Sequence, residues 1–496
     1  MTKLSYSKNE LISISVVFLI SVAVRIQINF STEYIPGNNG AYYLVVVRNI
    51  LENGSMWYND FPLVFYLEAA LAYIFMNVGL MNMNSAIVLS CRIFDSIVPV
   101  FAVIPAYLIV KKILDKNDKL FPKIVIASVS VLYIYFFTLV SDFQKNALGL
   151  LWLNWLLYYI LKTLESNSVK NILFSLLFFF LTAITHYGCI AVAIVIVSIS
   201  IVVPYLVMFT WRKIFISLAA AIVLVGATLL FIDYIFPFRF TMLIQAPVKM
   251  FESPVLGYIL KKQPVVTPFD IATIILINTV ALFSLFKYLR NNKVLADAER
   301  SFILTLVIIS LFLSSPLLSP EYAQRLYFIS YILIVPLLAF SYRMINSTLG
   351  KIITTTIIVI ILISSSLISI GKIKYSNMSV DLFKEMVKMK YALPQDEKSV
   401  IVARHGLEFW STWIFRNNAV RQEQLSADYW RWYEKIFFVV QKKNIAPFGP
   451  AGLHGTPYTE PAIPPKSKLI FRSIYFYLYE NTEAPNDFSI FSEKIK

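Results

Sequence analysis

The stretch EYIPGNNGAYYLVVVRNILENGSMWYNDFPLVFYLE, Glu33 to Glu68, is the first long polar interruption after an apolar segment. It holds the turn residues 37–40 (GNNG), paired tyrosines, a predicted amphipathic helix with Arg48 and Glu52, and the turn 60–63 (DFPL) into the next apolar run. A simple connector does not need this density of turn residues, aromatic rings and charges. The stretch therefore predicts an external catalytic or binding loop, around which the rest of the chain is arranged.

The composition places the chain in a membrane. Hydrophobic residues make up 58% of 496 positions, above the roughly 45–50% of soluble domains, and they form runs long enough to cross a bilayer. Lys and Arg (44) exceed Asp and Glu (29). Because much of this excess sits in short loops between apolar runs, it indicates positive-inside topology rather than nucleic-acid binding. Cys91 and Cys189 lie in apolar stretches, so neither a disulfide nor a cysteine zinc site is expected.

Twelve apolar segments follow one another along the chain. They lie near residues 10–29, 62–82, 93–112, 122–140, 146–162, 171–186, 188–210, 214–232, 270–288, 301–318, 326–342 and 351–371. The lysine-rich loop 111–123 is expected inside and the loop 30–61 outside, so an odd number of crossings separates them. We expect the segment 62–82, which contains Glu68 and Asn77, to be a re-entrant or peripheral helix. Eleven spans remain, with the N-terminus cytoplasmic and the C-terminus external.

Two domains are expected from this topology. Residues 1–371 form a membrane domain with external loops 30–61 and 233–269, and residues 372–496 form an external α/β domain. Within the second domain, 398–403 is predicted as a strand, 406–415 and 427–441 as helices, and 468–479 as one or two strands. The polar residues of interest are predicted at the outer face: Asn39, Asp60, Glu68, Asp142, Lys145, His186, Glu321, Arg325, His405 and His454. The sequence has no P-loop, GxSxG or HExxH motif.

The order of these features resembles the GT-C superfamily. The shared features are a first external loop with a helix and an Asp-x-Pro-Leu turn, an Arg opening the next span (Arg92), a basic end to that span, and an acidic residue on the second external loop. GT-C proteins are multispanning glycosyltransferases that use polyprenyl-phosphate sugars, such as protein O-mannosyltransferases, lipid A aminoarabinose transferases and the catalytic subunit of oligosaccharyltransferase. The resemblance covers residues 10–345 in arrangement.

The resemblance implies where the acceptor is activated. The acidic residue that the family carries on its first external loop corresponds to Asn39, and this is a departure, because an amide orients an acceptor but cannot act as a general base near neutral pH. Asp60, a metal-bound group or a substrate group would then supply the base, or catalysis is absent. A structural alternative is that Asp60 caps the helix after it.

The remaining site residues have paired interpretations as well. The resemblance makes Asp142 the second acidic site, which would bind an acceptor or a divalent cation, and makes Lys145, Arg92 and Arg325 ligands of the donor phosphate. Asp142 and Lys145 are alternatively a helix N-terminal acid and a snorkelling lysine. Arg92 is alternatively the partner of Asp95, and Arg325 an interfacial anchor. The loop 233–269 resembles a flexible loop that closes over a donor, or is a solvated basic loop.

The function implied is a hexosyltransferase-type membrane enzyme. It would move a sugar from a polyprenyl-phosphate donor to a glycan, lipid or protein acceptor at the outer face of the cell membrane, with a divalent cation as an optional cofactor and no nucleic-acid partner. Two alternatives stay open: a catalytically silent glycan-binding member of the same fold, and a transporter of lipid-linked glycans. The near absence of charges in the middle of the spans argues against transport.

Overall fold

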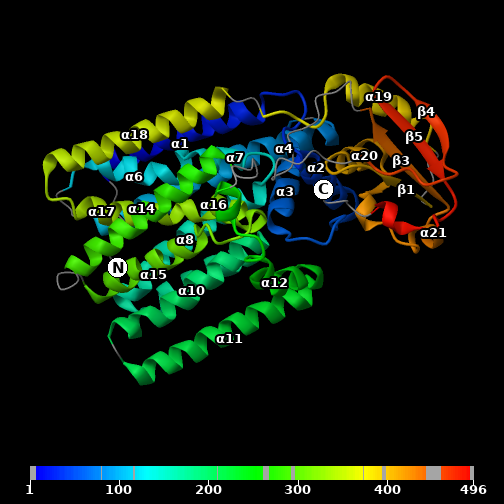
Figure 1. The fold of residues 1–496 in the computed structure, drawn as a ribbon. Coiled ribbons are helices and arrows are strands. Elements are labelled where there is room, and N and C mark those ends of the chain that lie inside the picture. The colour runs from blue at the N-terminus through cyan, green and yellow to red at the C-terminus, as the bar shows by residue number, and fades with distance from the viewer. Residues whose placement is uncertain are drawn as a thin grey trace. The chain divides into compact units, whose positions relative to one another are not determined.

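The computed structural model describes residues 7–79, 81–114, 118–208, 210–260, 267–291, 296–371, 374–393, 398–442 and 460–491. The fold is mostly helical, with one small sheet near the C-terminus (Figure 1). Contacts between residues divide the chain into two compact units. Unit 1 contains residues up to 28, 59–64 and the described part of 93–371; unit 2 contains 29–58, 65–92 and the described residues after 373.

The helices that precede the sheet region account for most of the chain. They are α1 (Lys8–Asn29), α2 (Gly40–Asn53), α3 (Leu63–Val78), α4 (Met83–Ile97), η1 (Val98–Ala102), α5 (Val103–Ile113), α6 (Leu120–Leu132), α7 (Ile134–Thr138), α8 (Gln144–Ser166), α9 (Val169–Ala183), α10 (Tyr187–Val207), α11 (Trp211–Ile235), α12 (Pro237–Lys249), α13 (Val255–Leu260), α14 (Pro268–Asn291), α15 (Asp297–Leu313), α16 (Pro320–Ser330), η2 (Tyr331–Leu333), α17 (Ile334–Arg343) and α18 (Thr348–Gly371).

The protein is a multi-pass membrane protein. In the described part of the chain, nine helical stretches are long and apolar enough to cross a bilayer. This is two fewer than the eleven expected spans, because α9 has 15 residues and α15 has 17, which correspond to roughly 22 and 26 Å of helix against a hydrocarbon core of about 30 Å. The helix α3, expected not to span, has 16 residues.

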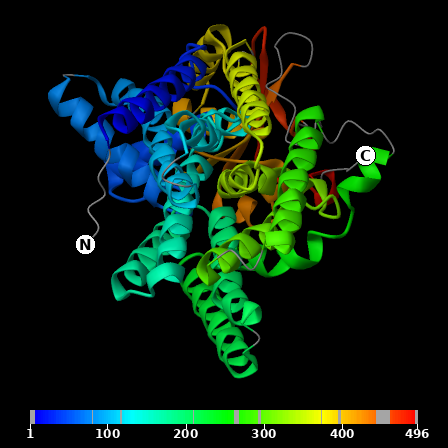
Figure 2. The same ribbon diagram turned by 90° about the vertical axis from the view of Figure 1, so that its left-hand side faces the viewer.

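Helices of unit 1 pack side by side in a bundle. The helix α10 packs against α8, α11 and α15, while α14 packs against α15 and α17, and α18 against α6 (Figure 1). Figure 2 shows the antiparallel pair α10 and α11 extending from the other helices of this unit. The side chains on α11 are largely exposed, as expected of a helix that faces lipid.

The described part of the expected external loop 233–269 contains two helices. Residues 237–249 and 255–260 form α12 and α13, while Lys261 and Lys262 lie outside the described residues. Backbone hydrogen bonds join this segment to the turn before α16: Val255 donates to the carbonyl of Leu318 (2.8 Å), and Ser319 donates to that of Met250 (2.6 Å). The segment is therefore ordered against the start of α16.

Unit 2 contains a five-stranded sheet in the order β2-β1-β3-β5-β4. The elements after α18 are α19 (Val380–Lys390), β1 (Ser399–Val402), α20 (Leu407–Phe415), β2 (Asn418–Val420), η3 (Gln422–Gln424), α21 (Tyr429–Trp432), β3 (Lys435–Gln441), β4 (Lys468–Arg472), β5 (Phe476–Asn481) and η4 (Phe488–Phe491). The strand β1 pairs in parallel with β2 and β3, with Val400 opposite Ile436, and β3 and β4 pair antiparallel with β5.

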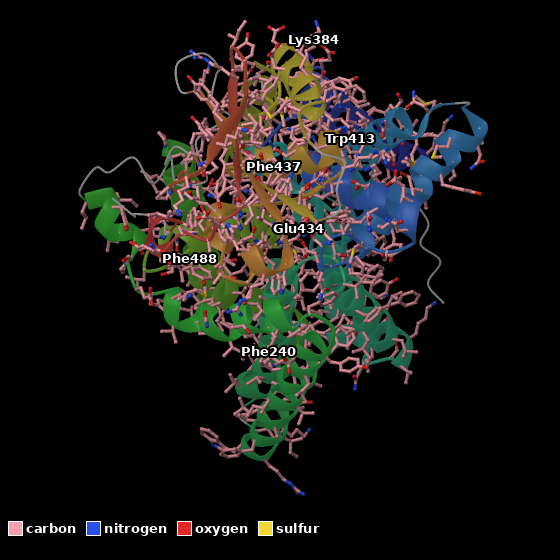
Figure 3. The ribbon with its side chains drawn as sticks, turned by 90° about the vertical axis from the view of Figure 1, so that its right-hand side faces the viewer. Phe240, Lys384, Trp413, Glu434, Phe437 and Phe488 are labelled. Carbon is pink, nitrogen blue, oxygen red and sulfur yellow. The ribbon has the colours of Figure 1, made fainter. Side chains whose placement is uncertain are left out.

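The expected strand at 398–403, helix at 406–415 and strands at 468–479 are confirmed, but the helix at 427–441 is wrong. Only Tyr429–Trp432 is helical there, and Lys435–Gln441 forms β3. Phe437, labelled in Figure 3, and Phe438 are fully buried on this central strand. A continuous run of aromatic and β-branched residues is what a strand buried on both faces requires.

The first predicted external loop packs into unit 2 with the C-terminal region. The ring of Tyr34 stacks on Phe383 of α19 (4.8 Å between centroids) and meets Trp410 of α20 edge-on. Gly37 forms a parallel bridge with Ser376. The predicted helix is present as α2, and it is buried through Asn49 except for Tyr42.

Candidate active site

Asp60 lies in the short segment 59–64 of unit 1 and is 2% exposed. One carboxylate oxygen accepts a hydrogen bond from the backbone N–H of Phe61 (2.8 Å). The other forms an ion pair with the ammonium group of Lys145, at the start of α8. The structure therefore brings together a residue predicted as catalytic and a residue predicted to bind phosphate.

The segment that carries Asp60 is held against the ends of several helices. The N–H of Leu63 donates to the carbonyl of Ile184 (3.2 Å), in the turn between α9 and α10. The ring of Phe61 packs against Phe236, which follows α11, with 4.6 Å between centroids. Since Phe61 is fully buried, these contacts hold the segment with Asp60 against the turn between α9 and α10 and the end of α11.

Lys145 and Arg325 flank the first turn of α10. Gly149, one turn after Lys145 on α8, packs on Cys189 so closely that an added Cβ would lie 2.4 Å from the sulfur. Ile329, one turn after Arg325 on α16, lies beside Gly188. Side chains four residues apart share a helix face, so both cations face the N-terminal end of α10.

The Arg325 guanidinium makes a direct contact there. It donates to the hydroxyl of Tyr187 at 2.5 Å, and the Tyr187 ring lies 4.8 Å from that of His186. His186 is the N-cap residue of α10. A helix N-terminus carries partial positive charge, so Arg325 and this helix end together form an electropositive region suited to an anion. The charge of Lys145 is balanced there by the Asp60 carboxylate.

The turn that carries Asp142 is held by a buried ion pair. Asp95 and Arg25 have fully buried side chains, with 2.8 Å between Oδ1 and Nη2. The other Asp95 oxygen accepts the N–H of Ser141 (2.9 Å), whose φ is 70°. Arg25 also donates to the carbonyls of Asp95 and Phe136. This network fixes the strained turn immediately before Asp142, which is half-buried.

Arg25 was missed in the sequence analysis, although a charged residue within an apolar span is itself a signal because burial in a membrane is costly. It is the partner that the structure gives to Asp95. Arg92, the partner considered earlier, lies in unit 2 and donates to the carbonyls of Thr32 (3.0 Å) and Glu33 (2.7 Å). Arg92 therefore ties down the start of the first predicted external loop.

Asn39 lies in unit 2 as the N-cap residue of α2 and makes no side-chain capping hydrogen bond. The preceding turn is joined to the C-terminal region, because the N–H of Gly37 donates to the carbonyl of Tyr375 (2.9 Å). Further along α2, Arg48 donates to the carbonyls of Trp413 (2.7 Å) and Thr412 (2.9 Å) on α20. Burial, with a smaller effect of nearby Arg416, lowers the pKa of Arg48 to about 10.

No group of three or more His, Cys, Asp or Glu side chains that could hold a metal ion occurs among the residues that the structure describes. His454 lies outside them. Both cysteines are buried, and neither forms a disulfide.

The fold and these groups define a helical multi-pass membrane protein with an electropositive region at one end of its bundle. No protein-family model and no curated protein sequence matches the chain. Among solved structures, the chain is similar to ArnT from Cupriavidus metallidurans bound to undecaprenyl phosphate, with TM-score 0.53, 10% identity, and coverage of 96% of this chain and 98% of ArnT.

A second similar structure is the arabinofuranosyltransferase AftD from Mycobacteria, with TM-score 0.51 and 11% identity over 90% of this chain and 36% of AftD. Both proteins are GT-C membrane glycosyltransferases. The predicted resemblance is thus confirmed at the level of the fold: the chain has an ArnT-like fold with a small C-terminal sheet.

Proposed function

We propose that this protein is a glycosyltransferase that moves a sugar from a polyprenyl-phosphate donor to an acceptor at the outer face of the membrane. The observation that carries the proposal is the electropositive region around the start of α10, on a fold similar over nearly its whole length to a protein bound to undecaprenyl phosphate. We also propose that the N-terminus is cytoplasmic and the C-terminal region external.

The chemistry requires a cation beside the leaving group. When the bond between the anomeric carbon and the phosphate oxygen breaks, negative charge grows on the phosphate, and a fixed guanidinium or ammonium group stabilises it. In our proposal Arg325 and Lys145 supply these charges. Asp60 holds Lys145 in place, and Asp142 accepts a hydrogen bond from the acceptor.

Two residues of unit 2 that were predicted for the site, Asn39 and Arg92, have secondary roles in the proposal. Asn39 hydrogen-bonds and orients the acceptor, since an amide cannot remove its proton. Arg92 is engaged with two backbone carbonyls, so its contribution to phosphate binding is indirect, through the position of the first external loop.

The test is transfer from a radiolabelled polyprenyl-phosphate sugar pool in membranes that contain equal amounts of each variant. We expect Lys145→Met to lower the transfer rate by about 100-fold, the loss typical of removing one group that stabilises a developing anion. Asp60→Asn should lower it less, because the ammonium group remains. The matched control is Lys398→Gln, which removes a lysine whose side chain is 66% exposed.

The competing function is a silent glycan-binding protein of the same fold. It predicts that the wild type transfers nothing from any donor and that only Asn39→Asp gains activity. The enzyme proposal predicts the opposite pattern, with an active wild type and a loss of transfer in Asp142→Asn and Arg325→Met.

A further inference from the structure

An apolar cavity of about 320 Å³ lies within unit 1, between α6, α14, α17 and α18. The helices α6 and α17 pack on each other, α14 packs on α17, and α18 packs on α6, so α14 and α18 flank the cavity (Figure 1). All of its lining residues belong to unit 1. The volume falls within the roughly 300–1,000 Å³ that is usual for ligand sites in proteins.

The lining of this cavity is almost entirely hydrocarbon. Its residues on α18 recur at the three- and four-residue spacing of one helix face: Thr354, Ile357, Ile358, Ile361 and Leu362. Two hydroxyls of the lining are engaged with neighbouring side chains, because Ser341 bonds to Ser284 (2.8 Å) and Tyr133 to Thr273 (2.7 Å). A buried water molecule needs about two to four polar partners, so this lining suits a hydrocarbon chain better than water.

The cavity opens toward the bilayer. Its rim includes Ile357, which is 51% exposed, and Phe283, which is 39% exposed. Both residues lie on helices that are long and apolar enough to cross a membrane, so the medium outside the rim is lipid rather than water. A lipid chain is therefore the ligand class that meets this opening.

The cavity extends along the helices for about the depth of one leaflet. Its lining runs from Ile334 to Ile345 on η2 and α17, and from Thr354 to Leu362 on α18. At about 1.5 Å per residue these stretches are roughly 12–17 Å long, against a hydrocarbon core of about 30 Å. The dimensions thus fit one acyl chain of a lipid in one leaflet.

The end of the cavity near Phe283 is basic. Lys287 follows Phe283 by one helical turn, and its ammonium group lies 5.3 Å from the centre of that ring. Arg290 on α14, Arg343 on α17 and Lys351 on α18 add further cations, and these three helices carry no acidic residue at this end. Arg343 and Lys351 each pair with one carboxylate from a neighbouring segment. The rim accordingly has more cations than carboxylates.

This basic end is remote from the electropositive region at the start of α10. Arg325 and Arg343 are the first and last residues of one apolar span of 19 residues, which is roughly 27 Å long. Lys351 lies at the Arg343 end, 5.1 Å from the ring of Tyr342. A phosphate bound at Arg325 and a phosphate bound near Lys351 would thus lie at opposite ends of the same span.

We infer that the cavity binds one acyl chain of an anionic phospholipid, whose phosphate lies at the basic end with Lys287, Arg290 and Lys351. The chain fills the space between α14 and α18, which otherwise lacks the close packing of a protein interior. The cations select the headgroup, since basic pockets between membrane helices favour anionic lipids. The bound lipid is distinct from the donor and the acceptor of the proposed reaction.

The experiment uses the full-length protein in detergent, stripped of native lipid. Added phosphatidylglycerol should bind as one molecule per protein, counted by native mass spectrometry. It should also raise the midpoint of thermal unfolding, because a ligand that binds only the folded state stabilises that state. Phosphatidylcholine, which has no net charge, should bind about tenfold more weakly.

Two variants fill the cavity. Thr279→Trp places an indole in the exposed rim and should raise the Kd for phosphatidylglycerol about tenfold, the loss expected when about two methylene groups of the chain are displaced. Leu338→Phe is a smaller change in the same lining, for use where the indole prevents folding. The matched control is Ile353→Trp, because Ile353 precedes Thr354 on α18 but is 49% exposed and lies outside the lining.

A third variant tests the headgroup. Lys287→Gln should lower the preference for phosphatidylglycerol over phosphatidylcholine about fivefold, the effect of one cation near a lipid phosphate. Its matched control is Lys170→Gln on α9, because Lys170 likewise lies near the ring of the residue four positions away, 6.0 Å from the centre of Phe174. The control should leave the preference unchanged.

Three results would overturn the inference. Binding that neither filling variant weakens would place the lipid elsewhere on the protein. Equal binding of the two phospholipids, unchanged in Lys287→Gln, would show that the basic end selects no headgroup. Undecaprenyl phosphate that displaces phosphatidylglycerol one for one would assign the cavity to a polyprenyl chain. Because transfer is not measured here, a wild type without transferase activity overturns the proposed function and leaves this inference standing.

Discussion

The buried pair of Arg25 and Asp95 allows one quantitative prediction about the stability of unit 1. Both side chains have zero exposure. Removing one member of such a pair leaves a charge in a low-dielectric interior, which costs about 3–5 kcal/mol. We expect Asp95→Asn and Arg25→Met each to destabilise the protein by an amount in this range, because the guanidinium binds the Asp95 carboxylate and two carbonyls and the carboxylate also accepts the Ser141 N–H.

The double variant Arg25→Met/Asp95→Asn should be far less destabilised than the sum of the single variants. With no charge left in the pocket, the penalty that dominates each single variant disappears, so the coupling energy of the cycle should be about 2–4 kcal/mol. The remaining loss comes from the Ser141 N–H, which no longer donates to a charged carboxylate, and from the carbonyls of Asp95 and Phe136, which lose the Arg25 donor.

The assay is equilibrium unfolding of the reconstituted protein with sodium dodecyl sulfate in mixed micelles. The control cycle uses Lys112 and Glu165, which lie 2.5 Å apart but are 28% and 36% exposed, and it should give a coupling below about 1 kcal/mol. The reasoning would be refuted if each single variant lost less than about 1 kcal/mol of unfolding free energy and the two losses were additive in the double variant. An unpaired charge excluded from water would have to cost more than that.

Three further predictions concern single contacts. Gly406→Ala should destabilise unit 2 by about 2 kcal/mol or more, because Gly406 has a positive φ and an added Cβ would clash with Asn377. The measurement is a lower midpoint of thermal unfolding. Arg48→Met should cost about 3 kcal/mol by losing two charge-assisted hydrogen bonds, and faster proteolysis in the C-terminal region would reveal it. Tyr187→Phe should change the free energy of unfolding by no more than about 1 kcal/mol. It should change the donor concentration that gives half-maximal rate, because the Tyr187 hydroxyl accepts a hydrogen bond from Arg325. An unchanged half-saturating concentration would show that this contact does not contribute to donor binding.

Several parts of the fold could be predicted because they depend on local pattern. Each of the twelve apolar segments contains a helix, since a long apolar run in a membrane must satisfy its backbone internally. The strand at 398–403 and the helix at 406–415 follow from short-range periodicity in the same way. The error at 427–441 arose because a buried strand has no alternation, and its apolar run was taken for a helix face.

The chemistry of individual residues also follows from sequence, but their partners do not. Asp60 and Lys145 were both singled out, for different roles, and the ion pair between residues 85 positions apart became visible only in the folded chain. Arg25 and Asp95 are 70 positions apart. Likewise, the first predicted external loop was assigned to the membrane domain, whereas its helix α2 packs on α20.

The sequence by itself determined the membrane class, the helical architecture, the small C-terminal sheet region and the residue types available for phosphate and proton chemistry. It could do so because hydrophobic periodicity and turn chemistry act over a few residues. Tertiary structure alone decided that Lys145 and Arg325 face the start of α10, and that Gly406 lies beside the Asn38-Asn39 turn. Those arrangements depend on helix packing and on close approaches such as that of Gly406, which join residues from tens to hundreds of positions apart and leave no local pattern in the chain.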